Sequence, residues 1–439
     1  MTNLAGPSIL AVAARIPPYE LRAADVARAC GRPPAPGGAR RFGSWDEDAF
    51  TLAFAAAERC LDIARRPELR FLIVASTTWP RTVAPHAERL AAALDLPADV
   101  ETATLAGSFR AGVAALRIAL SGARFPALVV AAERMDRPPG SDAEAAVGDA
   151  GVAILVGHGG FARLERWTTR SEPAAWDSAD ARFLQEQAAR LVSGAPREGC
   201  SRAAIAAPGA RVARAASQKL GLPCTDAAMD RIGFCGAAHP LLALAEATEE
   251  ARLGEPVLWA ACTEGLDAAV LHVTGQAGGK SFAEGLERVT PVAEYGKWLA
   301  SRRFFETEAS REVFRSLAME HRDEEHLLRL HAAKCSACGR LDALPAPSCP
   351  ACGEPRGTAR VPLRRTGTVF TFTHESYVPT PWPPVTMAVV DLDGGGRILV
   401  PAADISPEAV RIGLRVRLVL RRLHMGGGVP NYYWKAVPE

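Results

Sequence analysis

The stretch "ALVVAAERMDRPP" (residues 127–139), followed by "GDAGVAILVG" (residues 148–157), decides the fold of this 439-residue chain. An apolar run leads into a polar turn, and a second apolar run follows. The same layout returns in "PVLWAACTEGLDAAVLHVTG" (residues 256–275). Short apolar runs bounded by turn residues are typical of buried strands. The repeated layout therefore predicts two related halves within one domain.

Strand-like and helix-like segments alternate around this repeat, through roughly the first 275 residues. "FLIVAST" (residues 71–77) has the composition of a buried strand. "DEDAFTLAFAAAERCLDIA" (residues 46–64) and "HPLLALAEATEEARLG" (residues 239–254) are typical of helices. Such alternation indicates an α/β fold with many parallel strands. We expect residues 1–280 to form this α/β domain.

The composition changes after this domain. Residues 281–330 are rich in charged and aromatic side chains, and we expect them to form a helical connector on the surface. Farther along, segments such as "GTVFTFTHESYV" (residues 367–378) alternate polar and apolar residues and are separated by glycine turns. That pattern predicts a small all-β barrel over residues 361–439.

Two CxxC pairs, Cys335–Cys338 and Cys349–Cys352, lie between the connector and the barrel. Two such pairs on two short turns deliver four thiolates in tetrahedral geometry, which is the donor set of a structural zinc site. Unpaired thiols or a disulfide are the alternative. The spacing favours a zinc ribbon over residues 331–360, in which the metal stabilises a small domain and has no open position for a substrate.

Bulk composition argues against several classes of protein. The formal net charge is only +2, which disfavours a dedicated binder of nucleic acid or of an anionic membrane. Hydrophobic residues make up 48% of the chain, yet no apolar run is long enough to span a bilayer. The segment "ILAVAARIPPYEL" (residues 9–21) is too interrupted for a signal peptide. We expect a cytoplasmic protein whose ten cysteines form no disulfide scaffold.

The segments "KCSACGRLDALPAPSCPACG" (residues 334–353) and "VRIGLRVRLVLRRLHMGGGVPNYYWKAVP" (residues 410–438) carry a first family resemblance. Together they resemble the zinc-ribbon/OB-fold module found beside acyl-CoA thiolase-like enzymes. An OB barrel alone also permits binding of single-stranded nucleic acid. The mild basic excess and the sparse aromatic side chains of this region disfavour nucleic acid.

Several segments of the large domain, in their order and spacing, carry a second resemblance. They include "RIPPYELRAADVARA" (residues 15–29), "ASTTWP" (residues 75–80) and "GFCGAAHPLLALAEATEEARLGEPVL" (residues 233–258). Together they resemble the thiolase superfamily, in the branch that contains hydroxymethylglutaryl-CoA synthase and ketoacyl synthases. The resemblance implies a five-layered fold with duplicated halves, a homodimer, and a substrate that is a thioester of coenzyme A or of acyl carrier protein.

The second resemblance also implies a catalytic cysteine at the start of a buried helix, where the helix dipole favours the thiolate. In "ETATLAGSFRAGVAALRIAL" (residues 101–120), that position falls on Thr104 or Leu105. The expected histidine of the second half falls near residues 206–207, and the asparagine of a glycine-rich turn falls on Phe234. Because three positions are altered together, we predict that the chain forms no acyl-cysteine.

Other side chains near these positions are candidates for catalysis. Cys235 and His239, four residues apart at a helix start, form the first pair, with packing and capping as the alternative roles. Glu264 and Asp267 are acid–base candidates, although such residues more often hold a turn by hydrogen bonds. Thr104 is the hydroxyl at the expected nucleophile position.

Three further residues are assigned to substrate binding, because the resemblance places them beside the same site: Phe234, Leu105 and Ser108. Glu133, in contrast, is expected to be a surface or turn residue.

Two functions are open at this point. The first is an enzyme that makes or breaks a carbon–carbon bond in an acyl thioester, with aldol or retro-aldol chemistry favoured because it needs no cysteine. The second is a non-catalytic acyl-CoA-binding scaffold that supports a thiolase partner. Convergent acid and base groups around Thr104, Phe234 and Cys235 favour the enzyme, whereas an apolar, plugged pocket favours the scaffold.

Overall fold

The computed structural model describes residues 6–33, 38–81, 85–122, 124–172, 181–292, 294–305, 313, 316–342, 346–355, 359–378 and 380–439. Its centre is a ten-stranded sheet in the order β10-β9-β11-β12-β8-β1-β7-β6-β4-β5. The two five-stranded parts of this sheet meet at one register pair, between Ile9 of β1 and Ala162 of β8.

Both parts of the sheet have the same topology. The first contains β1 (Ser8–Arg15), β4 (Phe71–Ala75), β5 (Glu101–Leu105), β6 (Ala127–Glu133) and β7 (Ala150–Gly157). The second contains β8 (Ala162–Ser171), β9 (Arg202–Ala206), β10 (Cys224–Thr225), β11 (Pro256–Thr263) and β12 (Gly265–Val273). In each part the strands lie in the order first, fifth, fourth, second, third. The second strand pairs in parallel with both of its neighbours, and the other pairs are antiparallel. This identity confirms the predicted duplication.

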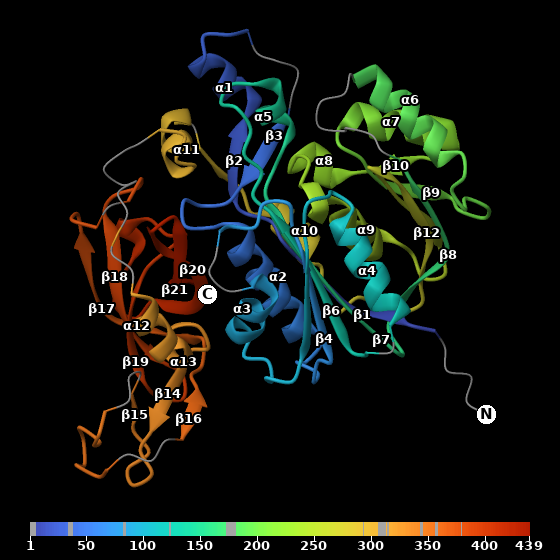
Figure 1. Cartoon of the computed structure of the whole chain (residues 1–439). Helices are drawn as coiled ribbons and strands as arrows, with labels where there is room; N and C mark the ends of the chain where they lie inside the picture. The colour runs from blue at the N-terminus through green and yellow to red at the C-terminus, as the bar shows by residue number, and fades with distance from the viewer. Residues whose placement is uncertain are drawn as a thin grey trace, which may run out of the picture.

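Helices complete five layers around the two parts of the sheet (Figure 1). On the outer side of the first part lie α2 (Ala49–Ile63) and α3 (His86–Ala93). Between the two parts lie α4 (Ala111–Ser121) and α9 (His239–Glu250), whose buried side chains share one core cluster. On the outer side of the second part lie α6 (Ala181–Val192) and α7 (Ala210–Leu220). The expected five-layered α/β fold is confirmed.

The large domain extends beyond residue 280, where the sequence placed its end. Phe282 and Leu286 of α10 (Ser281–Glu287) belong to the central core, so this helix is part of the layered fold and not of a surface connector. Trp298 of α11 (Tyr295–Ser301) is fully buried against Phe42, with ring centroids 6.1 Å apart. The sequence placed the end of the domain too early because the apolar side chains of α10 and α11 are interspersed with charged residues.

The remaining elements of the large domain are short. They are β2 (Tyr19–Arg22), α1 (Ala23–Ala29), β3 (Ala39–Phe42), α5 (Asp142–Ala146), α8 (Ala227–Arg231), the 3₁₀ turn η1 (Gly236–Ala238) and β13 (Thr290–Pro291). Among the residues described here, no helix is both long enough and apolar enough to cross a bilayer.

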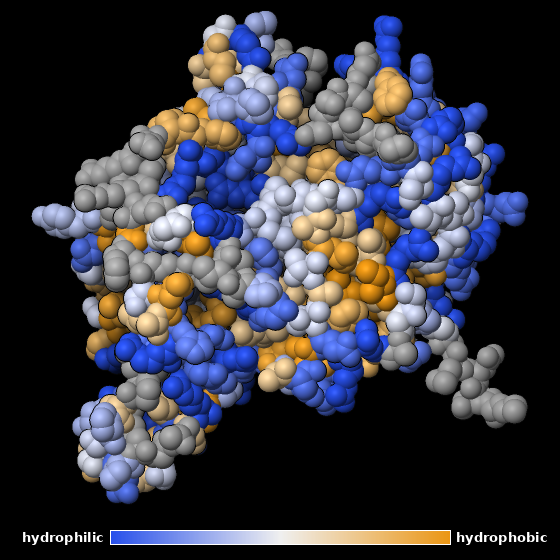
Figure 2. Space-filling view, viewed as in Figure 1, coloured by the Kyte–Doolittle hydropathy of each residue, from blue (hydrophilic) through white to orange (hydrophobic). Residues whose placement is uncertain are grey.

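The C-terminal part begins with α12 (Leu317–Arg322) and α13 (Glu324–Leu327). A three-stranded sheet of β14 (His331–Lys334), β15 (Leu341–Asp342) and β16 (Arg360–Pro362) follows. The barrel consists of β17 (Thr366–Glu375), β18 (Val385–Leu392), β19 (Arg397–Pro401), β20 (Arg415–Gly426) and β21 (Val429–Pro438), in the order β19-β18-β17-β20-β21. The small sheet projects from the body at the lower left of Figures 1 and 2, where its visible surface is largely hydrophilic.

The barrel is packed against helix α2 of the large domain. Phe54 of α2 meets the buried Trp434 of β21 edge to face, with ring centroids 5.6 Å apart. At the start of the same helix, Asp48 accepts a hydrogen bond from Thr51 N at 3.1 Å and another from the Tyr432 hydroxyl at 3.0 Å. The residue that caps α2 therefore also ties the barrel to the large domain.

Candidate functional site

The start of helix α4 lies later in the chain than the sequence indicated. Strand β5 runs to Leu105, Gly107 takes a left-handed conformation with φ of 81°, and α4 begins at Ala111 after Arg110 as N-cap. Thr104 and Leu105 are therefore strand residues in register with Val74 and Ala75 of β4. Placing either at the helix start was wrong, because the parallel pairing with β4 keeps the chain extended through Leu105. Phe109 and Arg110 occupy the helix start instead.

Aromatic packing fills the place where the nucleophile was expected. The ring of Phe109 meets the ring of Phe234 edge to face, with centroids 5.2 Å apart. Phe234 in turn lies against His239, again at 5.2 Å between centroids. Phe234 is only 4% exposed and shares an apolar cluster with Met135, Val147 and Met229. The first turn of α4 thus faces a hydrophobic plug.

Cys235 has the environment of a packing residue. It is fully buried, and its thiol donates to the carbonyl of Gly233 at 3.3 Å. Burial raises the pKa of the Cys235 thiol well above its usual value, and the nearby carboxylates add to that effect. The thiol therefore stays protonated at neutral pH, which makes it a poor nucleophile.

His239 lies with Asp226 and not, as the sequence suggested, in a pair with Cys235. The imidazole is fully buried, and its Nε2 is 3.5 Å from Oδ2 of Asp226. Within the described residues, neither ring nitrogen of His239 has a hydrogen-bond partner, and neither has Asp226 Oδ2. The other oxygen of Asp226 caps α8 through Met229 N at 2.9 Å. A buried imidazole beside a carboxylate is an acid–base arrangement, and the sequence analysis missed Asp226 because nothing in the spacing links it to His239.

Glu264, Ser108 and Asp267 come together at the start of α4. The Ser108 hydroxyl donates to Glu264 Oε2 and accepts from Arg110 N at 3.0 Å. Arg110 pairs with Asp267 Oδ2 through Nε at 2.9 Å and Nη2 at 2.8 Å. These contacts fasten the turn between β11 and β12 to the first turn of α4. Glu264 and Ser108 thus hold the two halves together in this structure.

Glu133, at the end of β6, is fully buried, so its expected place at the surface was wrong. It accepts hydrogen bonds from Thr77 N at 2.7 Å, from Thr78 Oγ1 at 2.5 Å and from Ala237 N at 3.1 Å. Burial raises the pKa of this carboxyl, against the opposing effect of its donors. Glu133 links the ends of β4 and β6 to the turn that carries Cys235. The hydroxyl run Ser76–Thr78 is the sequence signal for this cradle.

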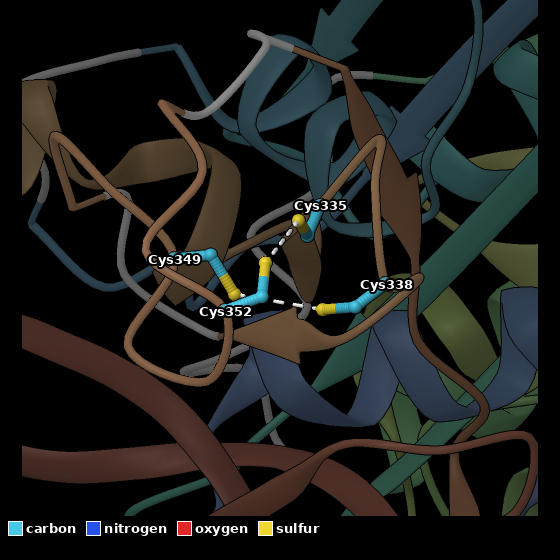
Figure 3. Close-up of side chains that lie close together, drawn as sticks. All are labelled: Cys335, Cys338, Cys349 and Cys352. Carbon is cyan, nitrogen blue, oxygen red and sulfur yellow. Dashed lines mark hydrogen bonds between the residues drawn. The ribbon is translucent and has the colours of Figure 1, made fainter.

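The four cysteines of the two CxxC pairs converge (Figure 3). Their Sγ atoms all lie within 4.8 Å of one another. Gly339 N donates to Cys335 O at 3.0 Å and Gly353 N donates to Cys349 O at 2.8 Å, and both glycines have positive φ. Each pair therefore closes a tight turn that aims two thiols at one point. The geometry is compatible with a zinc ribbon and suits a four-coordinate metal.

Comparison with known proteins identifies the C-terminal domain. Residues 360–421 match the family model described as "ChsH2, C-terminal OB-fold domain". A "DUF35 domain-containing scaffold protein" of Methanocaldococcus jannaschii is 30% identical over 114 residues, which is 25% of this chain and 81% of that protein.

The large domain has partial relatives. A hydroxymethylglutaryl-CoA synthase of Thermococcus onnurineus is 31% identical over 155 residues, 34% of this chain. One of Pyrococcus furiosus is 28% identical over the same length. The chain spans less than half, 44%, of each of these relatives.

Solved structures share the fold. A crystal structure of hydroxymethylglutaryl-CoA synthase complexed with CoA superposes with a TM-score of 0.59 at 14% identity, and covers 70% of this chain and 92% of that one. The 3-oxoacyl-(acyl carrier protein) synthase III of Pseudomonas aeruginosa PAO1 gives 0.54 at 17% identity, over 62% and 99% of the two chains. The chain belongs to the DUF35 domain family, and its large domain has the thiolase-like fold of these synthases.

Proposed function

We propose that this protein binds an acyl thioester of coenzyme A and makes or breaks a carbon–carbon bond in it by aldol or retro-aldol chemistry, without an acyl-cysteine. The observation that carries the proposal is the contrast at one site. The helix start that would hold a nucleophile carries Phe109, while a buried imidazole beside a carboxylate, His239 with Asp226, lies on the other side of Phe234. The partial relationship to hydroxymethylglutaryl-CoA synthases supports the thioester.

The retro-aldol direction requires one base and no covalent intermediate. His239 Nε2 takes the proton of the β-hydroxyl group, and Asp226 stabilises the imidazolium that forms. The Cα–Cβ bond breaks, the β-carbon becomes an aldehyde or ketone, and the electron pair of the broken bond stays on Cα as the thioester enolate. A proton returned to Cα gives the shorter acyl-CoA. Access to His239 requires the rings of Phe109 and Phe234 to turn aside.

The test is incubation of the purified protein with a panel of 3-hydroxyacyl-CoAs, followed by mass spectrometry of the products and of the intact protein. We expect a released carbonyl compound and a shorter acyl-CoA, with no adduct on the protein. D226N keeps the oxygen that caps α8 and should lower turnover at least about 100-fold, as loss of a general base assembly does. H239Q should do the same.

The matched control is H272Q, because His272 lies in β12 with its side chain 32% exposed. It should retain full turnover. An acyl adduct on Cys235, or equal activity in D226N and wild type, contradicts the proposed chemistry.

The aromatic plug favours a second candidate, a non-catalytic acyl-CoA-binding scaffold that supports a thiolase partner. Phe109 and Phe234 close the space beside α4, as expected for a site that has lost its reaction. Calorimetric binding of acyl-CoA without turnover across the panel would support this candidate and overturn the enzyme. A carrier-protein thioester, which presents the same phosphopantetheine arm, belongs in the same panel.

We further propose that the four-cysteine cluster holds a structural zinc ion. Cys335, Cys338, Cys349 and Cys352 supply a closed donor set, and all ten cysteines of the chain are free thiols, which fits a reducing compartment such as the cytoplasm. Metal analysis of the purified protein should find one zinc ion per chain, and C338S should lower that content. Zinc-free protein with intact cysteines contradicts the assignment.

A homodimer through the large domain is our last proposal here. Strand β5 is one of the two edges of the ten-stranded sheet, and hydrophobic side chains gather over α4 on the face in Figure 2. Ile118 of α4 is 42% exposed. An open strand edge beside an apolar patch is a favourable pairing surface. Light scattering should give twice the chain mass of 46.5 kDa.

A further inference from the structure

A cavity of about 580 Å³ lies where the large domain meets the barrel, away from the His239 site. The large domain contributes the start of β2, the segment Ser44–Asp46 and residues 290–292, 294 and 297. The barrel contributes residues 380 and 382–386, residues 402–407 and Lys435. Cavities of this size between domains are the usual places where small molecules bind. None of the lining residues belongs to the site proposed above.

The cavity walls are aromatic and stiff. Tyr19 and Trp382, from the two domains, meet with ring centroids 5.1 Å apart at 61°. The ring of Trp45 lies 4.3 Å from Nζ of Lys435. Five prolines also line the cavity: Pro18, Pro291, Pro383, Pro384 and Pro407. Rings and prolines lose little freedom on binding, so these walls suit a flat, rigid ligand.

Buried ion pairs hold the two domains in place around the cavity. Lys435 Nζ is 2.9 Å from Asp46 Oδ2, and Arg421 is 2.7 Å from Glu47 and 2.5 Å from Asp404. Arg15 is 2.7 Å from Glu47, and Lys297 is 3.0 Å from Glu294, both of which line the cavity, so four cations balance four carboxylates in and behind the walls. A charge-balanced wall offers no net attraction to an ion, so the walls favour a neutral ligand.

One donor in the wall has no acceptor. Nε1 of Trp382 is shielded from solvent and lacks a hydrogen-bond partner within the part of the chain described here. The main-chain N–H of Trp382, in contrast, donates to Thr380 Oγ1 at 3.2 Å. A buried indole N–H normally finds a partner, and leaving it without one is costly. For a ligand acceptor to reach this donor, the Trp382 ring must turn so that Nε1 faces the cavity that the residue lines.

We propose that the interdomain cavity binds a neutral, planar ring compound that carries a hydrogen-bond acceptor, such as a lactam or another carbonyl-bearing heterocycle. The ring stacks among Tyr19, Trp45 and Trp382, and its acceptor takes the indole N–H of Trp382. The ligand bridges the large domain and the barrel.

The test uses 2-quinolone, a planar lactam, against δ-valerolactam, which has the same polar groups on a saturated ring. Binding to the full chain is followed by saturation-transfer NMR and by tryptophan fluorescence. We expect 2-quinolone to bind with a Kd below about 1 mM, and δ-valerolactam to bind at least tenfold more weakly.

W382F keeps an aromatic ring but removes the indole N–H together with the second, fused ring, so it should weaken 2-quinolone about five- to tenfold. Its melting temperature checks that the variant is folded. The matched control F370A removes an aromatic ring that is 48% exposed on β17, outside the cavity, and should leave binding unchanged. No binding of 2-quinolone at 1 mM, or equal losses in W382F and F370A, overturns the proposal. D226N should bind 2-quinolone normally, so failure of either proposal is distinguishable from failure of the other.

Discussion

The two central helices, α4 and α9, occupy equivalent places in the duplicated halves, yet their first turns differ in chemistry. Helix α4 follows β5 and precedes β6, as α9 follows β10 and precedes β11. At the start of α4, the Ser108 hydroxyl donates a hydrogen bond to Glu264, and Arg110 forms an ion pair with Asp267. The start of α9 carries His239, whose ring nitrogens make no hydrogen bond among the described residues and whose Nε2 lies 3.5 Å from Asp226 Oδ2. Duplication thus preserves the layered scaffold, while the acid–base pair that we propose, His239 with Asp226, lies in the second half.

The largest loss of stability is expected from F234A, because Phe234 lies between the starts of α4 and α9. Removing a ring that is 4% exposed and packed on both Phe109 and His239 leaves a cavity. We expect a loss of about 3–5 kcal/mol in the free energy of unfolding, measured by urea denaturation. The exposed Phe370 provides the control, and F370A should cost less than about 1 kcal/mol. Equal losses would mean that Phe234 is not a packing centre.

A smaller loss of stability is expected when the ion pair between Arg110 and Asp267 at the start of α4 is removed. Asp267 is 4% exposed at its side chain and holds Arg110, so D267A leaves a partly buried guanidinium unpaired. We expect about 3 kcal/mol of destabilisation. D391A, which breaks the exposed pair of Asp391 with Arg397, should cost less than about 1 kcal/mol.

The double variant R110M/D267L sharpens the same test. If the pair serves to hold the halves together, replacing both partners by apolar residues should restore at least half of the loss. A double variant as unstable as D267A would indicate that the hydrogen bond from Thr169 to Asp267 carries the effect instead.

A reactive thiol is expected if the missing nucleophile is returned to α4. In F109C the introduced thiol sits at the helix start, where the dipole of α4 lowers the pKa of a cysteine. At pH 6.5 we expect iodoacetamide to modify this thiol about tenfold faster than the thiol introduced by T104C, since position 104 lies exposed in β5. Peptide mass spectrometry gives both rates. Equal rates would show that Phe109 does not occupy the position of a nucleophile.

The sequence predicted the scaffold better than the site, and particular residues show why. The strand–turn–strand repeat and the CxxC spacing are local patterns, and they predicted the duplication and the cysteine cluster. The cysteine position was assigned to Thr104 or Leu105, which lie in β5, because apolar periodicity does not reveal where parallel pairing ends and Gly107 turns the chain. Arg110 and Asp267 lie 157 positions apart in the chain, and only the fold brings them into contact. Contacts between helices and strands that are distant in the chain leave no pattern in the local sequence, so they could not be predicted.

The smallest expected effect concerns the fully buried thiol of Cys235. Burial raises the pKa of Cys235 in the folded protein well above that of an unfolded cysteine, about 8.5. A raised folded pKa contributes stability that is complete below the unfolded pKa and is lost as pH rises toward the folded one. Above about pH 8.5, wild type should therefore lose up to about 1.4 kcal/mol per pH unit more than C235A, in urea denaturation at pH 7–10.5. Parallel curves for the two proteins would mean that the thiol ionises in place, and Cys235 would return as a candidate nucleophile beside His239.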